Sequence, residues 1–567
     1  GSRLRLRRLI APGRGAMLRA LCNPLRIDRR SLVSFRVCLA LLVASEAAAL
    51  LADPSLLVGD GPLPLATLHS AVLPPTALLW SLHSMSGSAH LVRLLLLLQL
   101  SLAAALACGR RPRAAAFGCW ALVTSAHHRN PLATHGGDAL LRMELLLASL
   151  APLGAREAEV GGVCIAALLC QPLLMYFVAA LLKCSPAWRD AGELTAVHFA
   201  LHLDLAATPF ARLVREQRAF TRLATFLTPR LELCAPLLLL CPLRQWRTPA
   251  VGLGLALLLA LQLSFYACLE LGNFPWVSTV AVMPFVPSDF WSWLGARVPA
   301  LPSACWSWLG KNLPAGELLA APLRGQDGGA DSRATRLASA LTASAIGLWV
   351  IVWNVDHHCT LLRAYESLDW PECSRCVLCA VPVRMPERLK PMGEFLALYQ
   401  SWDLFAPEPN REDGSWVIAG TLSNGSYVDG ATGGPLTFDP PALPSAWYGG
   451  SHFLQYFLRL QFDALKPEGM QRPQLYSAIV RLDPSPLLGS SLPAVCGLLL
   501  IAHTCAVALQ AQWYCRRWPD LHLEQVCLYF VRKWIPAPGA PLSERELLSV
   551  WRELCPTRST SPANYVV

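Results

Sequence analysis

One lysine stands out among the residues that could do acid–base chemistry. The chain of 567 residues contains 48 Lys and Arg, but only five of them are Lys. Lys183 is the only one of the five inside a long apolar segment, where it follows the apolar run 163–182. Desolvation of an amine favours its neutral form, and a neutral amine can take a proton from an acidic hydroxyl group. A lysine at a helix end is also a common anchor at the membrane interface, so the position predicts a base or an anchor.

A second group of polar residues lies between two apolar segments. It combines three histidines with an arginine, an amide and a carboxylate: His127, His128, His135, Arg129, Asn130 and Asp138. Such a cluster could bind a polar head group or shuttle protons. The alternative is a solvated loop in which Arg129 and Asp138 pair with each other or with backbone carbonyl groups.

Ionisable and aromatic residues also interrupt the apolar segments themselves. An ionisable side chain in hydrocarbon is costly unless it is paired or faces an interior cavity. We therefore expect Arg142 and Glu232 to form a buried structural pair. Tyr176 and Trp188 lie near Lys183 in the sequence and could stack on a flat ring, although aromatic residues are also common interface anchors.

Most of the 20 cysteines lie in apolar runs, where a thiol behaves as a small hydrophobic group. The exception is Cys373, Cys376 and Cys379, preceded by Cys359. This spacing could hold zinc, or half of an iron–sulfur site that lacks its fourth cysteine. In a lumenal loop, however, disulfides are expected, so we predict disulfides and no metal. Asn424-Gly-Ser is also a glycosylation sequon.

The composition indicates a membrane protein. Hydrophobic residues make up 54% of the chain and charged residues only 15%, against about 25% charged in soluble domains. This excludes a soluble enzyme and a disordered protein. The net charge of +10 is concentrated near the start, where ten Arg fall within the first 36 residues. Basic segments before an apolar run usually stay cytoplasmic; nucleic-acid binding, which we do not expect, and an organelle transit peptide are the alternatives.

A membrane-spanning helix needs about 20 predominantly apolar residues. The candidate segments are 33–52, 89–108, 114–126, 139–153, 163–183, 230–243, 250–271, 273–287, 336–355 and 487–511. Because several are short, we expect about seven to nine true spans. The predicted fold class is an all-α polytopic membrane bundle with a small β-containing extramembrane domain.

The predicted organisation follows from these segments. It comprises a basic N-terminal segment at 1–30, a transmembrane bundle at 31–300, a loop at 301–335, a transmembrane helix at 336–355, a Cys-containing loop and small lumenal β-containing domain at 356–480, a transmembrane helix at 487–511 and a C-terminal tail at 512–567. The segment 416–422 is followed by 423–429, and the Asn424-Gly425 pair at the start of the second segment predicts a β-hairpin. If 487–511 crosses the membrane, the tail lies on the side opposite the β-containing domain. A buried or membrane-surface helix is the alternative for 487–511.

Several blocks, read in order, resemble the HTTM (horizontally transferred transmembrane) proteins, relatives of vitamin K-dependent gamma-glutamyl carboxylase. They are Leu-Val-Ser-Phe-Arg-Val at 32–37, Gly-Asp-Gly-Pro at 59–62, Ser-Ala-His-His-Arg-Asn-Pro at 125–131, Met-Tyr-Phe-Val-Ala-Ala-Leu-Leu-Lys at 175–183, Gly-Asn-Phe-Pro-Trp-Val at 272–277 and Gln-Ser-Trp-Asp-Leu-Phe-Ala-Pro at 400–407. The resemblance covers residues 30–300 and 395–440, and it is the order of the blocks that is specific.

The resemblance implies a reaction. In the carboxylase family, a lysine at the end of a membrane helix deprotonates vitamin K hydroquinone. The quinol then reacts with O2, becoming an epoxide and a strong base that takes a proton from the γ-carbon of a peptide glutamate, and the carbanion captures CO2. The family's Lys-x-x-x-x-Trp pattern falls on Lys183 and Trp188, and a histidine linked to carboxylation aligns with His135.

Two departures from the carboxylase pattern leave alternatives open. Leu182 stands where the carboxylase carries a second lysine, and the predicted soluble region is much smaller than the carboxylase region that holds propeptide and glutamate substrate. Quinol oxidation without carboxylation, or another hydrophobic substrate, is therefore an alternative to peptide carboxylation.

We therefore expect a quinol-dependent membrane enzyme, a carboxylase or epoxidase, that uses vitamin K hydroquinone or a related quinol with O2 and CO2. The expected base is Lys183, assisted by His135, and the residues expected to bind the quinone are Arg129, Asn130, Asp138, Tyr176 and Trp188. Expected partners are membrane lipid and a glutamate-containing peptide, in the endoplasmic reticulum or another endomembrane, with a cytoplasmic N-terminus.

Two other classes of function compete with this expectation. One is a non-catalytic membrane protein that binds lipid or quinone, or acts as an assembly subunit, in which Lys183 is an anchor. The other is a thiol–disulfide or metal protein centred on Cys373, Cys376 and Cys379.

Overall fold

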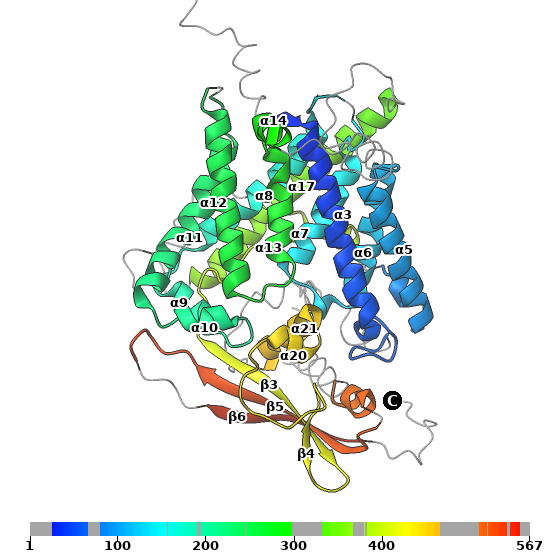
Figure 1. Ribbon diagram of the computed structural model, residues 1–567, viewed down its shortest axis with the longest axis vertical. Helices are drawn as coiled ribbons and strands as arrows, with labels where there is room; N and C mark the ends of the chain where they lie inside the picture. The colour runs from blue at the N-terminus through cyan, green and yellow to red at the C-terminus, as the bar shows by residue number, and fades with distance from the viewer. Residues whose placement is uncertain are drawn as a thin grey trace, which may run out of the picture.

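The computed structural model describes residues 25–65, 80–155, 157–189, 194–243, 245–297, 332–366, 379, 383–464, 510–518, 520–540 and 545–555. These residues form a helical bundle with a four-stranded sheet below one end (Figure 1). Several predictions fall outside the described residues: most of the basic segment 1–30, nearly all of the loop 301–335, Cys373 and Cys376, and all but the last two residues of 487–511.

The long helices of the bundle coincide with the predicted apolar segments up to residue 355. They are α3 (Arg29–Ala52), α5 (Ala89–Ala107), α6 (Pro112–Arg129), α7 (Gly136–Leu150), α8 (Val163–Leu182), α11 (Arg218–Leu239), α12 (Arg247–Cys268), α13 (Phe274–Val282) and α17 (Arg333–Glu366). α11 begins twelve residues before the predicted segment 230–243. Its early polar residues are tolerated because the hydroxyl groups of Thr225 and Thr228 donate to backbone carbonyls four residues earlier.

Among the described residues, five helices are long and apolar enough to cross a membrane: α3, α5, α8, α12 and residues Arg333–Leu362 of α17. A shorter apolar stretch covers Phe274–Phe285. This finding supports a membrane protein with a helical bundle, while the expected total of about seven to nine spans stays a prediction.

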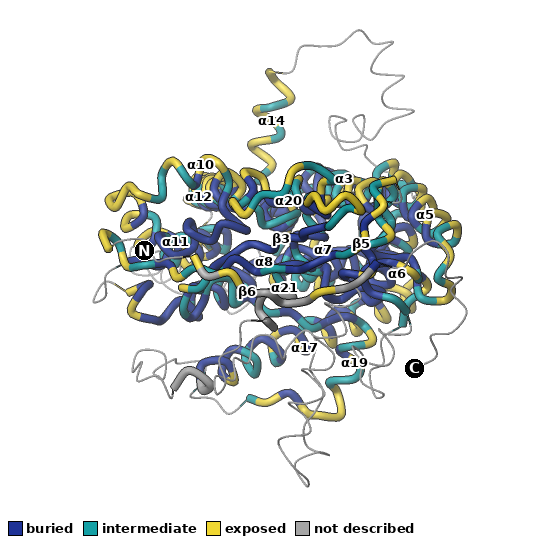
Figure 2. The backbone as a smooth tube through the Cα atoms, turned by 90° about the horizontal axis from the view of Figure 1, so that it is seen from below, coloured by how far each residue is buried: buried dark blue, intermediate teal, exposed yellow. Residues whose placement is uncertain are grey.

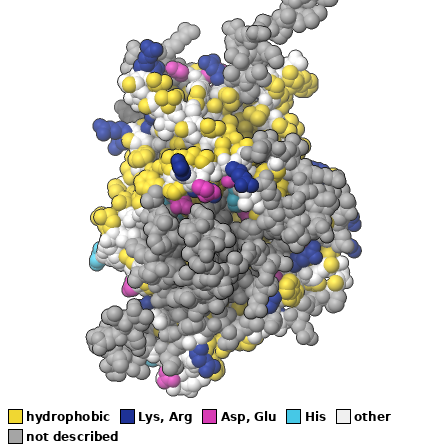
Figure 3. Space-filling view, turned by 180° about the vertical axis from the view of Figure 1, so that it is seen from behind, with side chains coloured by type: hydrophobic (Ala, Val, Ile, Leu, Met, Phe, Trp, Pro, Cys, Tyr) yellow, Lys and Arg dark blue, Asp and Glu magenta, His cyan; other side chains and the backbone are white. Residues whose placement is uncertain are grey.

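The outer faces of these helices are hydrophobic, as a lipid-facing surface requires. Examples with half or more of the side chain exposed are Leu94 and Leu97 on α5, Leu253 on α12 and Leu348 on α17. Hydrophobic side chains cover much of the described surface of the helical half in Figure 3. Figure 2 shows the contrast between the buried centre, which contains α7 and α8, and the more exposed rim at α5, α10 and α12.

The sheet lies below the bundle and has the strand order β4-β3-β5-β6, with antiparallel neighbours. The strands are β3 (Glu412–Leu422), β4 (Tyr427–Asp429), β5 (Leu523–Trp534) and β6 (Glu546–Leu554). β3 and β4 form the hairpin that the Asn-Gly pair predicted, and Gly425 in its turn has a φ of +79°, which favours glycine. A separate two-stranded ladder joins β1 (Ile27–Asp28) to β2 (Glu159–Val160).

The C-terminal strands belong to the sheet. β5 pairs with β3 along its whole length, from Glu412 opposite Trp534 to Leu422 opposite Leu523. The described part of the segment 512–567 that contains β5 and β6 therefore lies at the same end of the bundle as β3, an arrangement that the sequence left open. The sequence pattern could not reveal this, because antiparallel pairing over a gap of about 100 residues leaves no local signal.

Short helices lie at the end of the bundle near the sheet. They are α9 (Ala196–Leu201), α10 (Pro209–Val214), α20 (Pro444–Tyr448) and α21 (Ser451–Ala464), while α14 (Ser288–Arg297) lies at the opposite end. α19 (Lys390–Phe395) contacts Trp80, whose indole donates to the Phe395 carbonyl oxygen at 2.8 Å. α20 and α21 pack between the sheet and the bundle in Figure 1. The Trp416 indole on β3 donates to the Phe457 carbonyl oxygen at 3.1 Å, and the Tyr456 hydroxyl on α21 donates to the Pro62 carbonyl oxygen at 3.4 Å.

Candidate functional site

Lys183 lies in a cavity inside the bundle rather than at its lipid-facing surface. Its side chain is 3% exposed, and it ends α8 as the C-terminal capping residue. The cavity has a volume of about 90 Å³. Its walls come from α8, α9, α11, α12, α13 and the loop at 404–405, and most of its lining side chains are apolar. The anchor interpretation requires a lysine that reaches the interface, so this burial favours a role inside the bundle.

Glu232 on α11 is the partner of Lys183. The Lys183 Nζ donates to Glu232 Oε1 at 3.0 Å and lies 2.8 Å from Glu232 Oε2. It also donates to the carbonyl oxygen of Ala179 at 3.2 Å and lies 5.4 Å from the ring centre of Trp188. Both charged groups are nearly fully buried, so each would be strongly destabilising without the other.

This contact corrects the pair predicted from the sequence. Glu232 pairs with Lys183, and Arg142 donates through Nη1 to His127 Nδ1 at 2.9 Å. The sequence shows that Arg142 and Glu232 both need partners, because both lie in apolar segments. It does not show which of the buried ionisable side chains on the other helices lies beside each of them. The choice depends on how the helices pack, which is a long-range property.

A second polar pair lines the same cavity. Tyr176 on α8 is 2% exposed and Gln262 on α12 is 2% exposed. The Gln262 Nε2 donates to the Tyr176 hydroxyl oxygen at 2.9 Å. Tyr176 was predicted to bind the quinone, and the structure places it in the cavity; Gln262 was missed, although an amide inside the apolar run 250–268 was a visible signal.

The loop at 400–407 closes the cavity at the end nearer the sheet. Leu404 and Phe405 contribute to the lining. The Trp188 indole, 3% exposed, donates to the Phe405 carbonyl oxygen at 3.0 Å. Phe405 has a φ of +55°, which is unfavourable for a side chain of this kind and persists only where surrounding contacts hold it. Trp188 thus lines the cavity and also bonds to this loop, while its expected quinone-binding role stays a prediction.

His135 and Asp138 form the start of α7 and do not line the described cavity. The His135 Nδ1 accepts a hydrogen bond from the Gly137 backbone N–H at 3.0 Å, and Asp138 Oδ2 accepts one from the His135 N–H at 3.0 Å. This reciprocal arrangement is a capping box, which satisfies backbone donors at a helix start. Asp138 Oδ1 also accepts a hydrogen bond from Asn273 Nδ2 at 3.0 Å. His135 therefore reaches the cavity region only indirectly, through Asn273 next to the cavity residue Phe274.

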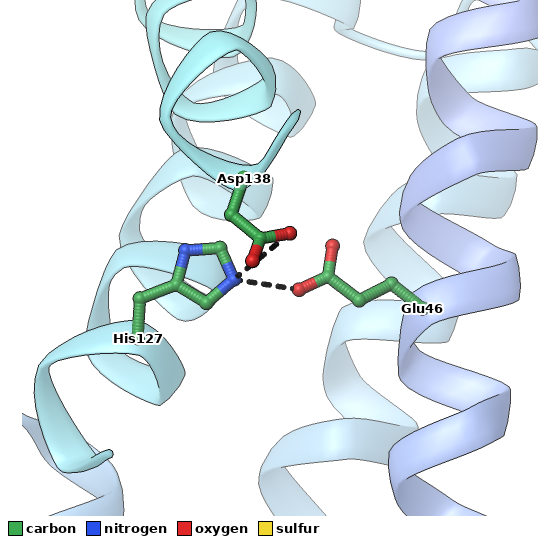
Figure 4. Close-up of side chains that lie close together, drawn as sticks. All are labelled: Glu46, His127 and Asp138. Carbon is green, nitrogen blue, oxygen red and sulfur yellow. Dashed lines mark hydrogen bonds and ion pairs between the residues drawn. The ribbon is translucent and has the colours of Figure 1, made fainter. Parts of the chain in front are cut away.

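A buried carboxylate–histidine cluster lies beside this helix start (Figure 4). The His127 Nε2 lies 2.8 Å from Glu46 Oε1 and 4.0 Å from Asp138 Oδ1. Glu46, His127 and Asp138 could hold a metal by distance alone, since one ligand atom from each lies within 4.8 Å of the others. The Arg142 guanidinium can only donate hydrogen bonds, so its bond to His127 makes Nδ1 the acceptor and places the ring proton on Nε2, which faces Glu46. This geometry fits a hydrogen-bonded network better than a metal centre.

Arg129 and Asn130 hold a loop of the backbone. The Arg129 Nη2 donates to the carbonyl oxygens of Val58 and Leu63, at 2.6 and 2.9 Å. Asn130 Nδ2 donates to the Leu56 carbonyl oxygen at 3.1 Å. Neither residue is among those that line the described cavity, where the quinone was expected to bind. Arg129 bonds to backbone carbonyl groups, as the alternative proposed, but it is buried rather than part of a solvated loop.

Two described disulfides join parts of the chain that are distant in sequence. Cys359 on α17 is bonded to Cys379, and Cys515 is bonded to Cys555 beyond the end of β6. Cys184, next to Lys183, is also disulfide-bonded. The first pair matches the predicted use of Cys359 and Cys379. Asn424 is exposed in the β3–β4 turn, which is compatible with its predicted modification.

No protein-family model, no curated protein and no solved structure matches this chain. The geometry of the site therefore carries the argument about function.

Proposed function

We propose that this protein is an integral membrane enzyme in which Lys183 takes a proton from a hydroxyl group of a quinol. The observation that carries the proposal is the Lys183–Glu232 pair in the cavity, where the two groups lie 2.8 Å apart. A proton can pass between groups at this separation. With the proton on Glu232, the amine is neutral and can accept a proton from the substrate.

The remaining residues of the cavity support a ring-shaped apolar substrate with a polar group. Met175, Phe265 and Phe274 supply apolar walls, and Trp188 supplies an aromatic face. After proton transfer, the Lys183 ammonium would lie beside the negatively charged quinolate and stabilise it. A bound quinol would supply the electrons for reduction of O2, giving an epoxide and water.

The volume of the cavity limits which substrates can enter it. At about 90 Å³ it is smaller than an engineered cavity of about 150 Å³ that accepts benzene. A quinol ring therefore enters only if side chains at the rim move. Phe220 on α11 and Ser264 on α12 are exposed members of the lining, so the gap between these helices is the entrance that we propose from the lipid side.

The proposed orientation places the sheet in the lumen of an endomembrane compartment, such as the endoplasmic reticulum, and the N-terminus in the cytoplasm. α3 begins at the end of the bundle opposite the sheet (Figure 1). Arg110, Arg111 and Arg113 lie at that same end, because Arg36 on α3 donates to the Ala107 carbonyl oxygen, and basic loops favour the cytoplasmic side. The Cys515–Cys555 disulfide in the sheet region fits an oxidising compartment.

The test uses the full chain in lipid nanodiscs with vitamin K hydroquinone, O2, labelled CO2 and a glutamate-containing peptide. We expect epoxide formation, and Lys183→Met should lower its rate by about 100-fold or more. The double variant Lys183→Met/Glu232→Leu should be equally inactive, and it leaves no unpaired buried charge to unfold the protein. Lys390→Met is the control, since Lys390 is a partly exposed lysine that does not line the cavity.

The outcomes separate three functions. Epoxide with label fixed in the peptide supports a coupled carboxylase, and epoxide without fixed label supports a quinol epoxidase. No epoxide, or equal rates in wild type and Lys183→Met, rules out the proposed function. Tight binding of quinol without turnover would support the second candidate, a non-catalytic lipid- or quinone-binding protein, which is also compatible with an ion pair that bridges α8 and α11.

A further inference from the structure

Gln262, which lines the cavity, carries a buried hydrogen-bond acceptor that is unused among the described residues. Its Nε2 donates to the Tyr176 hydroxyl oxygen, but its Oε1 has no hydrogen-bond partner among the described residues. The side chain is 2% exposed and lines the cavity. Leaving a buried carbonyl oxygen without a partner is energetically unfavourable, and α12 is otherwise apolar enough to cross a membrane. A ligand that donates a hydrogen bond would remove this cost.

Tyr176 complements Gln262. Its hydroxyl oxygen accepts the bond from Gln262, so its own proton can be donated, and no other described residue is bonded to it. The two side chains therefore offer one acceptor and one donor at neighbouring positions of the cavity wall. A hydroxyl group, which both donates and accepts, is the complement of this arrangement.

We propose that Gln262 and Tyr176 select the reduced form of the ligand, an aromatic diol, over its oxidised form, the dione; this rests on the proposed function. A diol can donate to Gln262 Oε1 and accept from the Tyr176 hydroxyl. A dione offers only acceptors, so it can use Tyr176 but leaves Gln262 Oε1 unpaired. The structure thus assigns to Gln262 a role in specificity that is separate from the proton transfer at Lys183.

Binding without turnover tests this inference. The full chain in nanodiscs is titrated under anaerobic conditions with 2-methyl-1,4-naphthoquinone and with its reduced diol, and affinity is measured by calorimetry. For wild type we expect the diol to bind roughly tenfold more tightly than the dione, the value of one hydrogen bond that satisfies a buried group. Gln262→Met should bring the ratio close to one by weakening the diol alone.

Two controls keep the experiment decisive. Gln99→Met removes another buried glutamine, on α5, whose amide atoms also lack partners among the described residues but which does not line the cavity; it should leave the ratio unchanged. The dimethyl ether of the diol has no donor, so wild-type protein should bind it no more tightly than the dione, and this measurement needs no variant.

The results distinguish this inference from the function on which it rests. If wild type binds both diol and dione but Gln262→Met does not change their ratio, only the selectivity proposal is overturned. If Gln262→Met weakens the dione instead, the amide presents its NH2 group and the proposal is again wrong. If wild type binds neither compound, both the selectivity and the quinol-dependent function are overturned.

Discussion

At the scale of single residues, the buried pair of Lys183 and Glu232 dominates the site. Lys183 also contacts the Ala179 carbonyl oxygen and lies over the Trp188 ring, so its ammonium is well held. A pair of this kind contributes little net stability over two apolar side chains, but losing one partner leaves an uncompensated charge. Retention of such a pair in an apolar cavity is therefore more readily explained by chemistry than by stability.

The pair predicts a specific pattern of stabilities. Lys183→Met alone and Glu232→Leu alone should each lower the free energy of unfolding by about 3–5 kcal/mol, whereas the double variant should lose much less. Thermal unfolding in detergent measures the difference. Lys390→Met, at the exposed pair with Glu387, should change stability by less than about 1 kcal/mol. Additive effects in the double variant would contradict the pairing.

At the scale of elements, the start of α7 shows how helix capping places several polar residues together. The His135 ring caps the helix by accepting a hydrogen bond from the Gly137 N–H, and the Asp138 carboxylate accepts one from the His135 N–H. Asp138 also binds Asn273, which precedes α13. The capping box therefore joins the starts of α7 and α13, and α13 carries the cavity residue Phe274. His135 is therefore linked to the element that carries Phe274 through Asp138 and Asn273.

Substitution of His135 tests this capping role. His135→Ala removes the cap and should lower the free energy of unfolding by about 1 kcal/mol, whereas His135→Asn retains a capping acceptor and should cost only a few tenths. Thermal unfolding of both variants checks the order. Equal destabilisation by Ala and Asn would show that the imidazole acts in another way, and the turnover of the Asn variant would then report whether the ring takes part in the reaction.

At the scale of the whole molecule, a buried charge cluster joins the sheet to the bundle. Lys533 on β5 contacts both Asp204, in the segment between α9 and α10, and Asp413 on β3. Asp413 Oδ2 also accepts a bond from the Asp204 backbone N–H at 2.7 Å. Burial is the main cause that raises the pKa of Asp413 to about 7; Lys533 acts to lower this pKa and the Asp204 carboxylate acts to raise it. Protonation of Asp413 is therefore linked to the stability of the folded state.

The raised pKa of Asp413 gives a pH dependence with a defined sign. The folded state holds the Asp413 proton more tightly than the unfolded chain does. The stability that this protonated carboxyl adds to the folded state is therefore complete below about pH 4 and is lost as the pH rises to about 7. Relative to the Asp413→Asn variant, the free energy of unfolding of the wild type should fall by up to about 4 kcal/mol across this pH range. Above this range the difference between the two proteins should stay constant.

Unfolding measured at several pH values in both proteins checks this expectation. Asp439→Asn, which alters an exposed carboxylate, is the matched control and should follow the wild type. Parallel pH profiles for the wild type and Asp413→Asn would show that Asp413 does not titrate in this range.

Much of the local structure could be predicted from the sequence. Apolar runs marked the long helices, and the Asn-Gly pair marked the β3–β4 hairpin, because both signals arise from neighbouring residues. Lys183 was singled out by its position at the end of one apolar run. These features depend on periodicity and local turn chemistry, which act over a few residues.

Only the tertiary structure decided which distant groups meet. It placed Glu232 beside Lys183 rather than beside Arg142, brought Gln262 beside Tyr176, and assigned His135 to a helix cap. It also paired β5 with β3. Each of these contacts joins segments far apart in the chain, and their choice depends on helix packing and strand register, which short-range sequence patterns do not encode. The sequence by itself therefore determined the membrane helices and the candidate base, and the packing determined the partners of that base.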